Sequence, residues 1–104
     1  MHNNQYDTLA EALEDLAERG YVEDFHVNSK GMLDGGAGQT FSPSQTELHE
    51  FHRFEGMTNP SDASIVYALR TNKGLKGTVV DAYGAEGSER ISEFMNSLRE
   101  RFEI

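Results

Sequence analysis

The spacing of the apolar residues constrains the fold of this 104-residue chain more than any other feature. Near each end, apolar residues recur every three or four positions, which is typical of an amphipathic helix. Between these two segments the period changes, and turn-forming residues separate short apolar runs, which is typical of strands. We therefore expect one α+β domain over residues 1–104, with residues 1–5 as a flexible tail.

Both ends of the first helix carry recognisable signals. Thr8 followed by Glu11 forms a capping box at its start. Gly20 suits the left-handed position that ends a helix, and Tyr21 follows it. These signals predict a helix over residues 8–19. The apolar stripe along it consists of Leu9, Ala12, Leu13 and Leu16.

The last helix is predicted by a stripe of large apolar residues on one face. The stripe consists of Ile91, Phe94, Met95, Leu98 and Phe102. Between the helices, residues 22–27 and a short segment at 32–33 are predicted as strands joined by a turn at 28–31. The glycine-rich residues 34–38 predict a loop, because this composition disfavours regular structure.

The clearest hairpin joins residues 64–71 to residues 77–83, with Thr71 expected opposite Gly77. One face of this hairpin carries only small apolar residues, and we expect both terminal helices to pack on it. Those residues are Val66, Ala68, Val80 and Ala82. The predicted architecture is a two-layer α+β sandwich (α-β-β-β-β-α), with a mainly antiparallel sheet of four to five strands and both helices on one face.

The opposite face of the hairpin carries Tyr67, Asp81 and Tyr83. If this face is open, the tyrosines supply apolar area and polar tips for a ligand or a partner, so the three residues are the candidate binding site. The alternative is that tyrosines complete the rim of the sheet or contact a second copy of the chain.

Residues 47–55 are predicted as a strand, although Leu48, Phe51 and Phe54 lie three apart, which indicates a bulge. His49 and His52 in this strand suggest a metal site, because imidazole and carboxylate groups suit divalent ions. Residues three apart on a regular strand point to opposite faces, so we expect solvated histidines, no metal site and no cofactor. We identify no catalytic residues.

The chain is acidic, with eighteen acidic residues against nine basic ones and a net charge of −9. Such a charge repels phosphates, so we expect no nucleic-acid binding. The acidity either maintains solubility or adapts the chain to a saline cytoplasm, since salt screens self-repulsion and only three basic residues are lysines. No apolar run is long enough to cross a bilayer, and the polar start is unlike a signal peptide. We expect a cytoplasmic protein.

Several short segments together resemble a family of small bacterial proteins often labelled phosphoribosylpyrophosphate synthetase. They are Tyr6–Thr8, Gly20–Tyr21, Arg53–Gly56, Asn59–Asp62, Ile65–Ala68, Lys76–Gly77 and Asp81–Gly84. The resemblance covers nearly the whole chain and implies a ribose-phosphate pyrophosphokinase. Such enzymes carry a ribose-phosphate loop of acidic residues followed by threonine-rich glycine sequence. The glycine cluster here has one preceding acid, Asp34, and one threonine, Thr40, so no catalytic residue is carried over.

Two functional hypotheses follow. The first is a non-enzymatic binding or regulatory module that uses an open sheet face or a homodimer surface, with a protein or a small molecule as its partner. The second is a small enzyme of nucleotide or sugar-phosphate metabolism, as the family label implies. A polar pocket with convergent acid and base groups would favour the enzyme. A flat aromatic sheet face would favour the module. Either function is compatible with a monomer or a homodimer.

Overall fold

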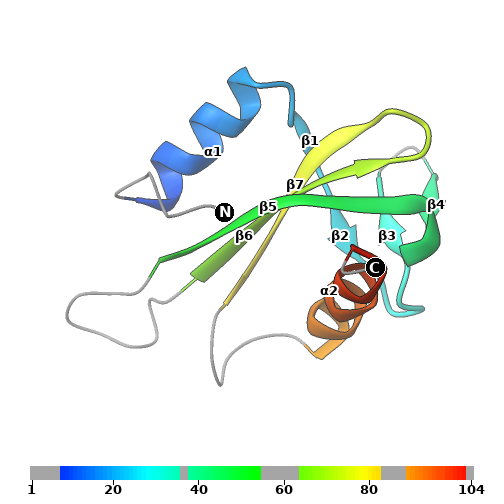
Figure 1. The fold of residues 1–104 in the computed structure, drawn as a ribbon. Helices are drawn as coiled ribbons and strands as arrows, with labels where there is room; N and C mark the ends of the chain where they lie inside the picture. Colours follow the sequence, from blue (N-terminus) through cyan, green and yellow to red (C-terminus); the bar gives the residue numbers. More distant parts are fainter. Residues whose placement is uncertain (1–7, 36–37, 55–63, 83–88, 103–104) are drawn as a thin grey trace.

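The computed structural model describes residues 8–35, 38–54, 64–82 and 89–102 (Figure 1). Its elements in chain order are α1 (Leu9–Glu18), β1 (Glu23–Asp24), β2 (His26–Val27), β3 (Leu33–Asp34), β4 (Thr40–Phe41), the short 3₁₀ helix η1 (Pro43–Gln45), β5 (Thr46–Phe54), β6 (Ser64–Thr71), β7 (Lys76–Ala82) and α2 (Glu89–Phe102). The expected flexible tail at 1–5 lies outside the described residues. No helix among the described residues is long and apolar enough to cross a membrane.

Helix α1 has the ends that the sequence predicts. The hydroxyl of Thr8 accepts a hydrogen bond from the backbone N–H of Glu11 at 3.1 Å. At the other end Gly20 has a φ of 106°. The N–H of Tyr21 reaches back to the carbonyl of Leu16 at 2.9 Å, which completes a Schellman cap. Local signals therefore determine where this helix begins and ends.

The strands form two sheets. The larger has the order β1-β7-β6-β5 and is antiparallel except for the β1–β7 pair. The smaller joins β2, β3 and β4. The predicted strand at 22–27 is divided at Phe25, so that β1 and β2 belong to different sheets. The predicted turn at 28–31 is confirmed, with Gly31 at a φ of 77° and Asn28 bonded to Met32.

The β6–β7 hairpin is confirmed, but its register differs from the expected one by two residues. Leu69, rather than Thr71, lies opposite Gly77. The reason is the tight turn, in which the N–H of Thr71 bonds to the carbonyl of Leu75 and Gly74 adopts a φ of 86°. A shift of two residues keeps every side chain on its predicted face.

The α+β class, the mainly antiparallel sheet and the terminal helices are confirmed, but the placement of both helices on one face is wrong. Val66 and Ala68 of β6 pack with Leu16 of α1. Leu69, on the opposite face of the same strand, packs with Leu98 of α2. Figure 1 shows the larger sheet between the two helices. Strand β6 is apolar on both faces, so each face requires its own cover.

The small sheet completes the core on the α2 side. Its buried residues pack in the same cluster as the buried stripe of α2. These residues are Phe25, Val27, Leu33 and Phe41, and the α2 stripe contributes Phe94, Met95 and Leu98. Helix α2 thus lies against the larger sheet and the small sheet together, whereas α1 packs on β6 and β7 of the larger sheet.

Candidate functional site

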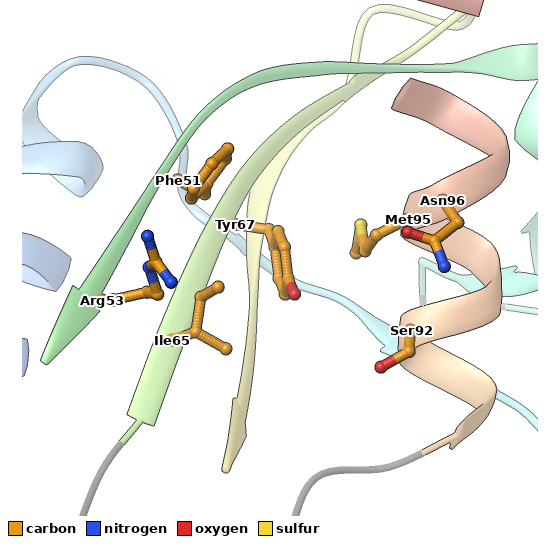
Figure 2. A pocket seen from close by; sticks show the side chains of 7 residues that line it. All are labelled: Phe51, Arg53, Ile65, Tyr67, Ser92, Met95 and Asn96. Carbon is orange, nitrogen blue, oxygen red and sulfur yellow. The ribbon is translucent and has the colours of Figure 1, made fainter. Parts of the chain in front are cut away.

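A pocket of about 300 Å³ lies between the larger sheet and helix α2 (Figure 2). One wall consists of side chains from strands β5 and β6, and the other of side chains from α2. The lining residues are Phe51, Arg53, Ile65, Tyr67, Ser92, Met95 and Asn96. The volume is at the lower end of the range for small-molecule sites.

A bulge in β5 determines which residues form the strand wall. The register between β5 and β6 shifts between Leu48 and Glu50, as the three-residue spacing indicated. Before the bulge, Leu48 faces α2. After it, Phe51 and Arg53 pair with Tyr67 and Ile65 and share their face. Without the inserted residue the strand would present Glu50 and His52 to this side instead.

The two walls differ in chemistry. On the strand wall the rings of Phe51 and Tyr67 lie 6.2 Å apart, tilted by 48°, in the range of favourable aromatic pairs. On the helix wall Ser92, Met95 and Asn96 follow the spacing that places side chains on one helical face. Met95 is buried, whereas Ser92 and Asn96 are exposed and bring a hydroxyl and an amide to the opening.

Of the three predicted site residues, the structure places one in the pocket. Tyr67 is half-buried and belongs to the strand wall, on β6 (Figure 2). Asp81 lies on β7 opposite Ile65, one strand beyond the lining residues, and its carboxylate accepts a hydrogen bond from the N–H of Ala82 at 2.8 Å. Tyr83 lies outside the described residues. Helix α2 covers much of this face, so the expected open surface is a pocket instead.

Arg53 is the charged residue among those lining the pocket in the described part of the chain. It is exposed, and in Figure 2 it lies beside Phe51 and Ile65. Sequence reasoning did not identify Arg53, Ser92 or Asn96. The bulge signal could have placed Phe51 and Arg53 beside Tyr67, but nothing local indicates that α2 brings Ser92 and Asn96 to the same place.

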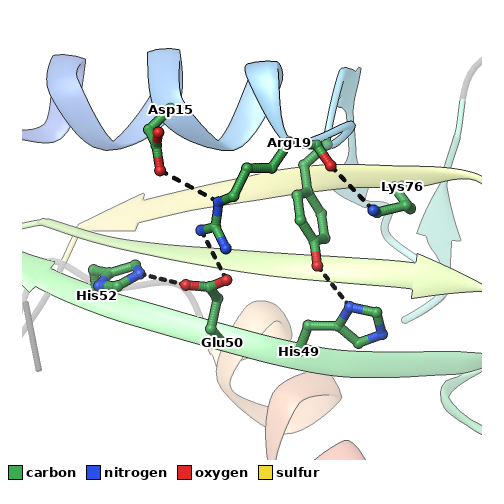
Figure 3. A network of polar contacts seen from close by, with 7 residues as sticks. Asp15, Arg19, His49, Glu50, His52 and Lys76 are labelled. Carbon is green, nitrogen blue, oxygen red and sulfur yellow. Dashed lines mark hydrogen bonds and ion pairs between the residues drawn. The ribbon is translucent and has the colours of Figure 1, made fainter. Parts of the chain in front are cut away.

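A network of polar contacts lies on the other face of the sheet, beneath α1 (Figure 3). Its centre is Glu50, whose two carboxylate oxygens lie 2.8 Å from the Arg19 guanidinium and 2.9 Å from Nε2 of His52. Because a carboxylate only accepts, Nε2 of His52 is the donor. Asp15 holds Arg19 from within α1 at 3.2 Å. The expected solvation of both histidines is wrong for His52, which is 1% exposed because the bulge turns it towards α1.

Tyr21 connects the end of α1 to the same strand. Its hydroxyl lies 2.7 Å from Nδ1 of His49, whose Nε2 lies 3.2 Å from Glu47. The ammonium group of Lys76 lies 4.3 Å from the centre of the Tyr21 ring and donates to the carbonyl of Arg19 at 3.1 Å. Burial and the nearby Glu50 raise the pKa of Tyr21, and Arg19 partly opposes this shift.

The network resembles catalytic groups in composition but not in arrangement. The hydroxyl of Tyr21, the imidazole of His49 and the carboxylate of Glu47 form a chain of contacts. The raised pKa of Tyr21, however, disfavours the tyrosinate that a nucleophile or base would require. Several of these side chains bond to one another, although the buried Nδ1 of His52 makes no hydrogen bond. The contacts join the end of α1 to β5 and β7. No group of three metal-ligating side chains converges among the described residues.

Comparisons of the chain with protein-family models, with curated proteins and with solved structures each return no match, so its function must be argued from this geometry.

Proposed function

We propose that the chain is a non-enzymatic binding or regulatory module that takes a small organic ligand in the pocket between β5, β6 and α2. The observation that carries this proposal is the composition of the pocket. Four apolar or aromatic side chains surround a space of about 300 Å³, and three polar side chains converge on it. A concave site in which a few polar groups converge beside apolar side chains is a common form of a small-molecule site.

The distribution of titratable groups favours binding over catalysis. General acid–base chemistry requires an acid and a base within hydrogen-bonding reach of the bound substrate. The residues that line the pocket include no histidine or carboxylate in the described part of the chain. His49, Glu50 and His52 belong to the α1 side of the sheet. The acid and base groups of this network are thus separated from the cavity by the sheet itself.

The proposal can be tested by nuclear magnetic resonance of the ¹⁵N-labelled chain with a panel of metabolites. Binding in the pocket should shift the amide signals of Phe51, Tyr67 and Asn96 first. A tryptophan at Ser92 should fill the opening and abolish the shifts. A tryptophan at Ser97, which is exposed on the same helix and does not line the pocket, should leave them intact. A panel that moves signals elsewhere, or nowhere, would contradict the proposal.

An activity assay separates this proposal from the enzyme that the family resemblance implies. We expect no turnover when the chain is incubated with ATP, magnesium and ribose phosphate. The control is a preparation of the Ser92→Trp variant. If the original chain forms more phosphoribosyl pyrophosphate than this control, the binding module is contradicted and the chain is an enzyme that uses the same pocket.

A further inference from the structure

We infer that the pocket between β5, β6 and α2 selects an uncharged cyclic polyol, a compound of the size and chemistry of a monosaccharide. A cavity of about 300 Å³ holds on the order of ten non-hydrogen atoms, since a water-sized group occupies roughly 30 Å³ in a liquid. This inference rests on the proposed function and specifies the chemical class of its ligand.

The helix wall supplies hydrogen-bonding groups that the rest of the described chain does not use. Ser92 and Asn96 lie about one turn apart on α2 and both line the pocket (Figure 2). Both are exposed, and neither side chain bonds to another described residue. Ser97 on the same helix differs, because its hydroxyl donates to a backbone carbonyl of α2 at 3.2 Å. Arg53 and Tyr67 line the pocket too, but they take part in other interactions. We therefore assign recognition of the ligand to the helix wall.

The chemistry of the helix wall points to hydroxyl groups. The hydroxyl of Ser92 donates and accepts, and the amide of Asn96 donates through its nitrogen and accepts through its oxygen. A ligand hydroxyl also does both, so it can pair with either side chain in either direction. Side chains four residues apart on a helix are separated by about 5–6 Å. Two hydroxyls of one ring can bridge this separation through their hydrogen bonds.

The charges around the pocket favour an uncharged ligand. The residues that line it include no carboxylate in the described part of the chain, so a bound cation would lack an opposite charge there. An anion would meet the field of a chain whose net charge is −9. A neutral polyol meets neither obstacle.

The strand wall suits the ring of such a compound. Phe51 and Ile65 border the cavity from the sheet, and Met95 borders it from the helix. The C–H groups on the face of a saturated ring can gain dispersion contacts with these side chains, while its hydroxyls reach the polar ones. A ligand without hydroxyls would displace water from Ser92 and Asn96 and would not replace its hydrogen bonds.

Three kinds of probe test the inference through the amide signals of the pocket residues. They are a methyl glycoside, the 6-phosphate of the same sugar, and 2-methoxytetrahydropyran, which has the ring and the methoxy group without hydroxyls. The glucoside, galactoside and mannoside are compared first, and the tightest is carried forward. We expect it to bind with a Kd on the order of 1 mM, typical of a ligand this small. The other two probes should bind about tenfold more weakly, because one adds charge and the other lacks hydroxyls.

Variants of the helix wall connect the preference to its source. Ser92→Ala and Asn96→Leu should each weaken the glycoside about fivefold and leave binding of 2-methoxytetrahydropyran unchanged. Ser97→Ala is the matched control, because Ser97 is equally exposed on α2 and does not line the pocket. It should change neither affinity.

The outcomes that contradict the inference differ from those that contradict the proposed function. Equal binding of 2-methoxytetrahydropyran, or tighter binding of the phosphate, overturns the uncharged polyol while the pocket remains a binding site. An equal loss in Ser92→Ala and Ser97→Ala overturns the role of Ser92. If no glycoside shifts the signals at on the order of 50 mM, the inference fails, and the metabolite panel decides the proposed function independently.

Discussion

Replacing Gly77 by alanine should destabilise this protein, although the same change in an ordinary strand is stabilising by about 0.5–1 kcal/mol. Gly77 is buried on β7 and lies opposite Glu23 in the parallel pair with β1. A Cβ atom at this position would contact the carbonyl oxygen of Glu23 and would lie 2.6 Å from its Cβ and 2.8 Å from its carbonyl carbon. Two of these three atoms belong to the backbone, so a rotamer change does not relieve the overlap.

The magnitude follows from the displacement that the added methyl group requires. Carbon atoms approach to about 3.5–4.0 Å, so β1 must move by roughly 1 Å. Overpacking of this kind costs about 1–3 kcal/mol. The displacement also weakens the hydrogen bond from Phe25 to the carbonyl of Thr78, now 2.9 Å, which is worth about 0.5–1.5 kcal/mol. A change from glycine to alanine ordinarily stabilises a strand, and this gain must be subtracted. We therefore expect a loss of about 1–3.5 kcal/mol in the free energy of unfolding.

Urea denaturation followed by circular dichroism measures this loss, and amide hydrogen exchange at Phe25 locates it. Gly31→Ala is the control, because Gly31 has a φ of 77° but nothing within 4 Å of an added Cβ. It should cost about 1 kcal/mol through backbone strain. It should not accelerate exchange at Phe25 beyond its effect on global stability. If Gly77→Ala is neutral or stabilising, the close approach of β1 to β7 is incorrect.

Three further predictions concern the two faces of the sheet and the surface charge. Leu16→Ala and Leu98→Ala should each cost about 2–5 kcal/mol. The double variant should be additive within about 0.5 kcal/mol, since these residues pack on opposite faces; strong coupling would contradict the separation. The pKa of Tyr21 is raised in the folded state, so the folded chain holds the phenol proton more tightly than the unfolded chain does. The free energy of unfolding should therefore fall as the pH rises above 10.0, the ordinary pKa of tyrosine. Urea midpoints of Tyr21→Phe should be less sensitive to pH in that range. Finally, the melting temperature should rise across a KCl series if the acidity reflects a saline cytoplasm, and a flat response would contradict that hypothesis.

The sequence predicted those elements whose signals lie within a few residues. The cap at Thr8, the left-handed Gly20 and the turn that ends at Gly31 each act through backbone conformation or hydrogen bonds between near neighbours. The bulge in β5 is also a local signal, because an inserted residue changes the apolar spacing from two to three. Such features remain the same whatever the rest of the chain does.

The assignment of helices to faces failed because it depends on contacts between distant segments. Both helices carry an apolar stripe, and either could cover the small residues Val66 and Ala68. The informative signal was in β6 itself, where the run from Ile65 to Leu69 is apolar on both faces. A strand of this kind requires cover on each side. The β2–β3 hairpin of the small sheet was predicted, but β4 and the separation of this sheet from the larger one were not, since its strands contain only two residues each.

The candidate site was predicted in part. Tyr67 was chosen as an aromatic residue on the less apolar face, and it does line the pocket. Arg53 and Asn96 reach the pocket from segments far apart in the chain, and only the folded arrangement brings them together. Asp81 lies on the same face of the sheet as the pocket but on β7, one strand away from the lining strands β5 and β6.

The bulge in β5 explains why the two faces of the sheet differ in chemistry. One inserted residue sends Glu50 and His52 to the α1 side, where Arg19 meets the carboxylate. The same insertion sends Phe51 and Arg53 to the α2 side. On the first side the polar groups bond to one another and hold the end of α1. On the second, the aromatic ring and the guanidinium group border a cavity. The same bulge thus produces a packed polar network on the α1 face and a cavity on the α2 face.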